Sequence, residues 1–235
     1  MDIGLGKWGR RCCFASLRVR LKARLAFFTL FLACSAFSVG AQEQSAGGPV
    51  RILALGDSLT AGYGLPAQDG FVAQLGDALA AAGHDVVMID AGVSGDTTAG
   101  GLSRLDWALA GGADVAIIEL GANDALRGID PASSRANLDG ILAALGGRGI
   151  PALLAGIYAP RNLGPEYVAA FDAMYPELAA EHDAILYPFF LEGVAADPTL
   201  NQGDGIHPNP RGVVIIVENM LPDVIALIER AGEGS

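Results

Sequence analysis

The sequence predicts an α/β fold in which helices cover both faces of a central, mainly parallel five-stranded sheet. Two observations predict it. Short apolar runs of strand length alternate with longer segments that have helical spacing, and this alternation is typical of parallel sheets. Polar, glycine-containing turns follow several of the apolar runs, at the strand ends where such sheets place their ligand sites.

Five short runs are predicted to be strands. The first, 50–55, is largely apolar and stops at Gly56, as a short buried strand does. The other four are predicted at 85–90, 115–120, 152–156 and 184–187.

Five longer segments are predicted to be helices. Apolar residues recur at helical spacing through 71–82, and Gly83 follows as a C-cap. A helix over 131–146 has a proline near its first turn, a favoured position. The remaining helices are predicted at 99–110, 165–181 and 212–230. Pro176 and Pro222 lie inside the last two, so a kink or break is expected there.

Residues 1–41 have the layout of a secretory signal peptide. Seven basic residues precede Leu25, an apolar run continues to Val39, and small residues lead to a predicted cleavage after Ala41. The apolar run is shorter than the roughly 20 residues that span a bilayer, so an uncleaved membrane anchor is the less favoured alternative. We therefore expect one domain, 42–235, that is periplasmic or secreted and has no stable membrane insertion after cleavage.

Two other export routes have weaker support. Arg10-Arg11 loosely resembles a twin-arginine signal, and the residues before Cys34 match a lipoprotein box poorly. Cys34 and the other two cysteines all lie in the leader. The mature chain is then expected to have no disulfide, no thiolate chemistry and no cysteine-bound zinc.

The predicted domain is strongly acidic. Seven of the 15 basic residues and one of the 26 acidic residues lie in 1–41, which leaves eight basic and 25 acidic residues and a net charge of −17. Such a surface repels nucleic acid phosphates and anionic membranes, so neither is expected as a partner. The sequence sets no oligomeric state.

Two polar segments carry the residue types of an activated serine. Ser58, in Gly-Asp-Ser-Leu-Thr, directly follows the first predicted strand. The alternative is that Asp57 or Ser58 caps a helix. Asp204 precedes His207 by three residues on a glycine-containing turn, so its carboxylate can orient the imidazole that serves as a base. His84 and His182 lack such a turn and are expected at helix ends.

Two further turns carry hydrogen-bond donors. Gly95 follows the second predicted strand, and a glycine N–H there can approach an oxyanion closely. Asn123 follows the third strand, and its amide can donate to the same oxygen. The alternatives are a plain glycine-rich turn and an Asx turn. The Gly-x-Ser-x-Gly elbow of α/β-hydrolases is absent around Ser58.

These four segments resemble, in order, the four blocks of the SGNH-hydrolase (GDSL esterase/lipase) family. Ser58, Gly95, Asn123 and His207 match the four residues that name the family, and Asp204 matches the acid of its Asp-x-x-His block. The motifs most resemble the bacterial arylesterase, acyl-CoA thioesterase and lysophospholipase branch. The resemblance implies a flavodoxin-like three-layer α/β/α sandwich.

The resemblance also implies a secreted serine esterase that hydrolyses aryl esters, acyl thioesters or lysophospholipids without cofactor or metal. In it, Ser58, His207 and Asp204 form the triad, and Ser58, Gly95 and Asn123 form the oxyanion hole. One alternative is a carbohydrate O-deacetylase of the same fold. The other is a noncatalytic periplasmic binder of acyl ligands.

The segment 159–164 lies where that branch has a mobile loop beside the acyl pocket. Pro160 and Leu163 are expected to line the acyl side, Gly164 to let the loop close, and Arg161 to reach the same sheet edge as Ser58. The alternative is a solvated connection between strand and helix.

Overall fold

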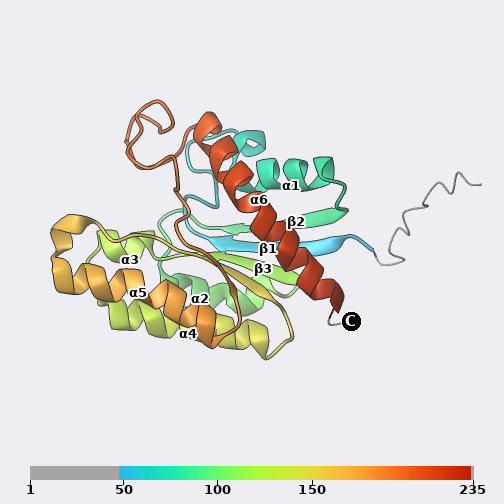
Figure 1. Ribbon diagram of the computed structural model, residues 1–235, viewed down its shortest axis with the longest axis horizontal. Helices are drawn as coiled ribbons and strands as arrows, with labels where there is room; N and C mark the ends of the chain where they lie inside the picture. Colours follow the sequence, from blue (N-terminus) through green and yellow to red (C-terminus); the bar gives the residue numbers. More distant parts are fainter. Residues whose placement is uncertain (1–47, 234–235) are drawn as a thin grey trace, which may run out of the picture. The chain divides into compact units, whose positions relative to one another are not determined.

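The structure, a computed structural model, describes residues 48–233 (Figure 1). The predicted signal peptide, 1–41, and the predicted start of the domain at Gln42 lie outside the described residues. Within 48–233, none of the helices combines the length and the apolar character needed to cross a bilayer.

One five-stranded sheet forms the centre of the fold. All neighbouring strands are parallel, in the order β2-β1-β3-β4-β5. The strands are β1 (Val50–Gly56), β2 (Val86–Gly92), β3 (Val115–Glu119), β4 (Ala152–Ala155) and β5 (Ile185–Tyr187). Each ends within two residues of the prediction. This is the flavodoxin-like strand order. The chain adds β2 on one side of β1 and then crosses to add β3 on the other side, and this switch opens a crevice between β1 and β3.

The burial of the strands explains their sequence pattern. All five residues of β3 are buried, and β1 is buried from Ile52 to Gly56. These central strands have helices on both faces, so both sides of the pleat are apolar. The edge strand β2 is mostly part-exposed, which is consistent with its acidic Asp90.

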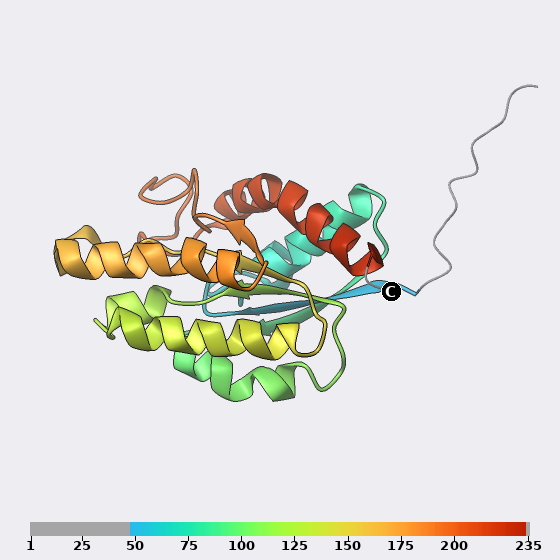
Figure 2. The same cartoon turned by 60° about the horizontal axis from the view of Figure 1, so that its bottom comes forward.

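The helices form one layer on each face of the sheet (Figures 1 and 2). On one face, α1 (Phe71–Ala81) packs against α6 (Pro210–Glu233). On the other face, α4 (Pro131–Gly146) packs between α2 (Thr98–Ala108) and α5 (Pro165–Glu181). The predicted three-layer α/β/α fold is confirmed.

Local signals account for several helix ends. The Thr97 side chain accepts the Gly100 N–H at 3.3 Å and caps α2. Asp130 caps α4 by accepting the Ala132 N–H at 3.0 Å, and Pro131 occupies a first-turn position that needs no N–H donor.

The structure excludes the break that was one of two alternatives at Pro176 and Pro222, and it adds one helix that was not predicted. Neither Pro176 nor Pro222 breaks its helix: α5 and α6 run through them. Buried side chains on both sides of Pro176, such as Phe171 and Leu178, offset the hydrogen bond that a proline removes. The short helix α3 (Ala122–Leu126) was not predicted, because five residues are too few for a periodic pattern.

Candidate active site

Ser58 lies in the tight turn that follows β1, at the crevice between β1 and β3. Only glycine fits before this turn, because a Cβ at Gly56 would lie 1.9 Å from Thr60 Oγ1. Asp57 is fully buried and its Oδ1 accepts the Leu59 N–H at 3.0 Å. The next α-helix begins only at Phe71, so neither Asp57 nor Ser58 caps an α-helix.

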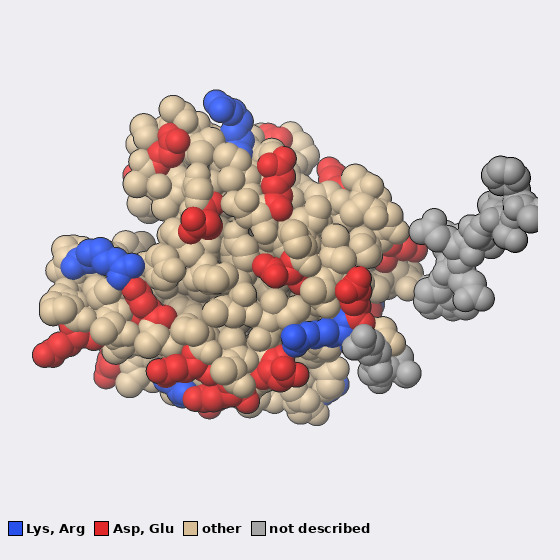
Figure 3. Space-filling view, viewed as in Figure 1, with Lys and Arg blue, Asp and Glu red and all other residues tan. Residues whose placement is uncertain are grey.

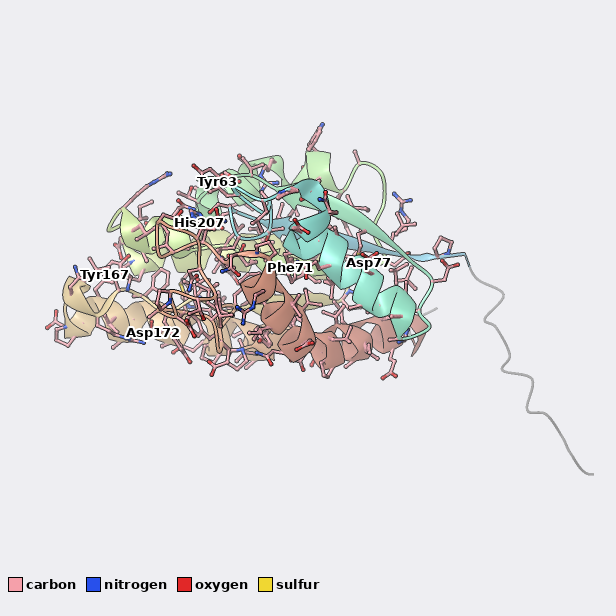
Figure 4. All side chains as sticks on the ribbon, turned by 90° about the horizontal axis from the view of Figure 1, so that it is seen from above. Tyr63, Phe71, Asp77, Tyr167, Asp172 and His207 are labelled. Atoms are coloured by element: carbon pink, nitrogen blue, oxygen red, sulfur yellow. The ribbon has the colours of Figure 1, made fainter. Side chains whose placement is uncertain are left out.

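The loop before α6 brings His207 and Asp204 to Ser58. His207 Nε2 lies 2.9 Å from Ser58 Oγ, and its Nδ1 lies 2.7 Å from Asp204 Oδ2. The ring of Tyr63 lies beside that of His207, with 4.7 Å between centroids (Figure 4). A hydroxyl, an imidazole and a carboxylate in this order can move a proton from the serine to the histidine.

Asp204 is held as a carboxylate by its own turn. The hydrogen bond to His207 is the largest of several effects that lower its pKa to about 2. The backbone N–H groups of Ile206 and His207 add to it, each donating to Oδ1 at 3.1 Å. Asp204 therefore stays ionised over the whole neutral pH range.

Three hydrogen-bond donors belong to residues that line one cavity, which are Ser58, Gly95 and Asn123. Among residues 48–233, the backbone N–H groups of Ser58 and Gly95 have no acceptor. Gly95 has a φ of +83°, and the Asp96 N–H donates to the Val93 carbonyl at 3.0 Å. This is a turn whose third residue needs a positive φ, and glycine takes it without strain. Asn123, in α3, uses one amide hydrogen for Asp57 Oδ2 at 3.0 Å, which leaves the other free.

Two buried carboxyl groups lie behind the turn. Glu119 Oε2, at the end of β3, accepts the Thr60 hydroxyl at 2.8 Å and faces the Asp57 N–H at 3.4 Å. Burial raises the pKa of Glu119 well above its usual value, and the neighbouring Asp57 raises it further. Burial also raises the pKa of Asp57, while hydrogen bonds from Leu59 and Asn123 oppose this. These directions favour a neutral Glu119 beneath an Asp57 that accepts two hydrogen bonds.

Two arginines fix the Gly95 turn. Arg104 in α2 donates to Asp96 at 2.7 Å and to the Gly56 carbonyl at 2.9 Å. Arg127, after α3, donates to the Gly95 carbonyl at 2.7 Å. The turn that carries the second backbone donor is thus tied both to the end of β1 and to the segment that carries Asn123.

A cavity of about 350 Å³ opens beside Ser58 and His207. Its wall is mainly apolar and comes from several strand-end loops and from the short helix α3. The apolar and aromatic lining residues are Leu59, Tyr63, Ala122, Ala125, Leu126, Ile157, Tyr158, Pro160, Phe189, Leu191 and Ile206. Ser94, Gly95 and Asn123 complete the lining. An apolar cavity with a few convergent polar groups can hold an acyl chain with its carbonyl at Ser58.

The predicted substrate loop lies only partly at this cavity. Pro160 lines it, whereas Arg161, Leu163 and Gly164 are not among its lining residues. Arg161 is bound to Asp172 of α5 at 2.5 Å, and its guanidinium lies 5.3 Å from the Tyr158 ring. Gly164 is the N-cap of α5. Arg161 therefore does not line the cavity itself; it contacts the Tyr158 ring, which does.

Other histidine and acidic groups lie apart from the cavity. Asp139, Glu181 and His182 bring potential metal ligand atoms within 4.8 Å of one another. His182 Nε2 is, however, 2.7 Å from Asp139, and Glu181 is paired with Arg135. None of these three lines the cavity beside Ser58, so they have no part in its chemistry.

Sequence reasoning missed the residues that support the site, which include Tyr63, Arg104, Glu119 and Arg127. Glu119 could have been noticed as an acidic residue that ends an otherwise apolar strand. The two arginines gave no such signal, because each of them reaches its partner only through the tertiary fold.

Comparisons with known proteins agree with the fold and identify the family. The model of the GDSL-like Lipase/Acylhydrolase family matches residues 54–214. Esterase TesA from Pseudomonas aeruginosa is 42% identical over 75% of this chain and 89% of its own. A solved structure of TesA matches with a TM-score of 0.72 at 42% identity, covering 75% of this chain and 99% of that one.

Two further relatives have named activities. An arylesterase from Vibrio mimicus is 37% identical over 86% of this chain and 98% of its own. Thioesterase 1/protease 1/lysophospholipase L1 from Escherichia coli K12 is 36% identical over 85% of this chain and 91% of its own.

Together these findings define the class of the protein, which is a carboxylic-ester hydrolase with small-molecule ester substrates. More narrowly, the chain belongs to the GDSL-like lipase/acylhydrolase, or SGNH-hydrolase, family.

Proposed function

We propose that the protein hydrolyses carboxylic esters through an acyl-enzyme intermediate on Ser58. The observation that carries this proposal is the continuous contact from Ser58 Oγ to His207 Nε2 (2.9 Å) and from His207 Nδ1 to Asp204 (2.7 Å). His207 takes the hydroxyl proton as Oγ bonds to the acyl carbon, and Asp204 stabilises the resulting imidazolium.

The tetrahedral intermediate places its negative oxygen among the Ser58 and Gly95 N–H groups and the free amide hydrogen of Asn123. Such donors stabilise charge that develops only in the transition state. As the intermediate collapses, the bond to the leaving oxygen or sulfur breaks, and that atom takes the proton from His207. A water molecule then attacks the acyl carbon, gives its proton to His207, and releases the acid as Ser58 regains its proton.

The cavity supports a medium-length acyl group as substrate. Its wall is largely apolar and its volume is about 350 Å³, at the small end of ligand pockets. Aryl esters, acyl thioesters and lysophospholipids all present such a group, and named relatives include an arylesterase and a thioesterase/lysophospholipase.

Two alternatives have less support. A carbohydrate O-deacetylase would present many polar groups to the hydroxyls of a sugar, whereas the wall around Ser58 is mainly apolar. A noncatalytic acyl binder would not need Ser58, His207 and Asp204 in mutual hydrogen-bond contact.

The proposed place of action is the periplasm or the exterior. The basic and apolar leader supports export. The face shown in Figure 3 carries many acidic and few basic side chains, so after cleavage it would repel anionic membrane surfaces. Intact-mass measurement of periplasmic material tests this proposal. A mass that begins near Gln42 is expected, and a mass that still includes Met1 would contradict cleavage.

The Ser58→Ala variant tests the chemistry. It should keep the wild-type melting temperature and lose at least several powers of ten in kcat for p-nitrophenyl esters, as loss of a triad nucleophile does. Turnover near the wild-type rate would remove the serine mechanism.

A further inference from the structure

A chain of hydrogen bonds joins the backbone at Ser58 to the backbone at His207, 149 residues away. The Tyr63 N–H donates to the Ser58 carbonyl at 3.0 Å. The Tyr63 carbonyl in turn accepts from the Gln202 side-chain amide at 2.7 Å. The same amide nitrogen donates to the Pro208 carbonyl at 3.0 Å, and the Gln202 backbone N–H donates to the His207 carbonyl at 2.7 Å.

The loop around His207 is closed on itself by Gln202. Asn201 and Pro208 form an isolated antiparallel bridge, and the Gly205 N–H donates to the Gln202 carbonyl at 3.0 Å. Asp204 and His207 therefore sit in a compact hairpin-like loop. The position of this loop relative to Ser58 therefore depends on its contacts with the segment that follows Ser58, such as the hydrogen bond from Gln202 to the Tyr63 carbonyl.

The chain after Ser58 is shaped to receive the Gln202 amide. A Cβ at Gly64 would lie 2.3 Å from Gln202 Oε1, so the side chain lies against bare backbone there. Both amide hydrogens are used, one for the Ser58 turn and one for the His207 loop. A shorter side chain would lose one of the two contacts, and an apolar one would lose both.

We propose that Gln202 is a positioning residue that sets the distance between Ser58 Oγ and His207 Nε2. The inference rests on the proposed function. Proton transfer needs these atoms within hydrogen-bond reach, and a misplacement of about 1 Å can cost about a hundredfold in rate. Gln202 does not touch the reacting atoms; it acts on them through Tyr63 and through the loop of His207.

The test compares Gln202→Met with a matched variant, Gln74→Met. Methionine keeps the length of the side chain and removes its donors. Gln74 also donates to two backbone carbonyls, those of Asp69 (2.7 Å) and Pro210 (3.3 Å), and it does not line the cavity. Both variants should lose similar thermal stability, because each gives up the same kind of contact.

Only Gln202→Met should lose turnover. We expect kcat for p-nitrophenyl acetate to fall by about ten- to a hundredfold with little change in KM. The maximal rate constant for inactivation by a p-nitrophenyl alkylphosphonate, in which Ser58 Oγ displaces p-nitrophenolate from phosphorus, reports the attack step alone and should fall by the same factor. Gln202→Asn keeps the amide but not its reach, so its kcat should lie between those of Gln202→Met and the wild type.

Three results would overturn the inference: wild-type kcat in Gln202→Met, equal losses of kcat in Gln202→Met and Gln74→Met, or a rise in KM alone. If Gln202→Met does not fold, the Gln202→Asn variant decides by the same criteria. Ser58→Ala is measured in parallel. An active Ser58→Ala variant would refute the proposed function, whereas an inactive one beside a fully active Gln202→Met variant would refute the role of Gln202 alone.

Discussion

Ser58 stands between two polar regions that are stabilised in opposite ways. On one side, Asp57 and Glu119 are fully buried, and their carboxyl groups depend on hydrogen bonds from Thr60, Leu59 and Asn123. On the other side, the Asp204 side chain is 39% exposed and is held by the N–H groups of its own loop. Burial raises the pKa of Glu119, while hydrogen bonds lower that of Asp204.

The two regions have different proposed tasks: the buried one holds the turn of Ser58 in place, and the exposed one takes part in proton transfer. In the proposed mechanism, the buried side fixes the turn of Ser58 and the amide of Asn123, where dipoles that do not reorganise would stabilise the developing charge. The exposed side carries the carboxylate that would stay ionised beside a histidine that gains and loses a proton. Asp204 also adds stability above its unfolded pKa of 3.8, and this contribution is lost as the pH falls through about 2.

The largest effect is expected from the exposed side. Asp204→Asn should lower kcat by about 10³–10⁴ because the amide favours the wrong tautomer of His207. Unfolding by urea at pH 7 should show only a small loss of stability, because the residue lies at the surface, where solvent screens the contribution of its charge. A large loss of stability with little loss of kcat would show that Asp204 supports the loop and not the chemistry.

A smaller effect on rate, with a clear effect on stability, is expected from the buried side. Asn123→Ala removes an oxyanion donor and should lower kcat by about 10²–10³. It also takes one of the hydrogen bonds from buried Asp57, which should cost about 1–3 kcal/mol in the free energy of unfolding. Steady-state kinetics and urea unfolding measure the two effects. If only KM rises, Asn123 contacts the bound ester and not the oxyanion.

The buried acid should be visible in the pH dependence of stability. Burial raises the pKa of Glu119 above its ordinary value of 4.5, so the folded state binds this proton more tightly than the unfolded chain and the carboxyl makes the fold less stable as the pH rises. Glu119→Gln removes that cost while keeping a neutral side chain of the same shape.

The stability advantage of Glu119→Gln over the wild type should therefore grow with pH, by up to about 1.4 kcal/mol per pH unit. Urea titrations between pH 5 and pH 8 measure it, and kcat at pH 7 should be largely kept. Parallel stability curves for the two proteins would mean that Glu119 binds its proton no more tightly in the folded state than in the unfolded chain.

The smallest effect concerns the choice of acyl chain. Leu191 lines the cavity and Leu163 does not, so the two leucines form a matched pair. Leu191→Ala should lower kcat/KM for octanoyl esters roughly four- to fifteenfold more than for acetyl esters, as one or two methylenes lose burial at about 0.8 kcal/mol each. Leu163→Ala should be nearly neutral. A larger loss for octanoyl over acetyl esters in Leu163→Ala than in Leu191→Ala would show that the loop at 159–164 contacts the acyl chain.

The sequence was most informative where structure follows from local pattern. The five strands were predicted from their apolar runs, and Ser58, Gly95 and Asn123 were correctly placed shortly after three strands of a parallel sheet, although Asn123 lies in the short helix α3 and not in a turn. Asp204 and His207 were linked by their spacing in one turn. The roles of these residues in catalysis remain predictions.

Long-range contacts could not be predicted in this way. Arg104 and Arg127 reach the Gly95 turn from α2 and from the segment after α3, and Gln202 reaches Tyr63 across 139 residues. Nothing in the spacing of such residues indicates their partners. Pro160 and Leu163 of the loop at 159–164 were expected to line the acyl side, but of these two only Pro160 lines the cavity. Ala159 and Arg161 are bound to Asp172 of α5, a contact that the sequence does not indicate.

The most direct test of the account is to locate a covalent adduct on Ser58. The protein is inactivated with a p-nitrophenyl alkylphosphonate, from which Ser58 Oγ displaces p-nitrophenolate at phosphorus. Cleavage after arginine then releases the peptide 52–104. Fragmentation mass spectrometry then assigns the modified residue. The account predicts one phosphonyl group, on Ser58, formed at a rate that falls sharply in Asp204→Asn. A modification on Ser94, Ser103 or any other residue, with Ser58 unmodified in the inactive protein, would contradict it.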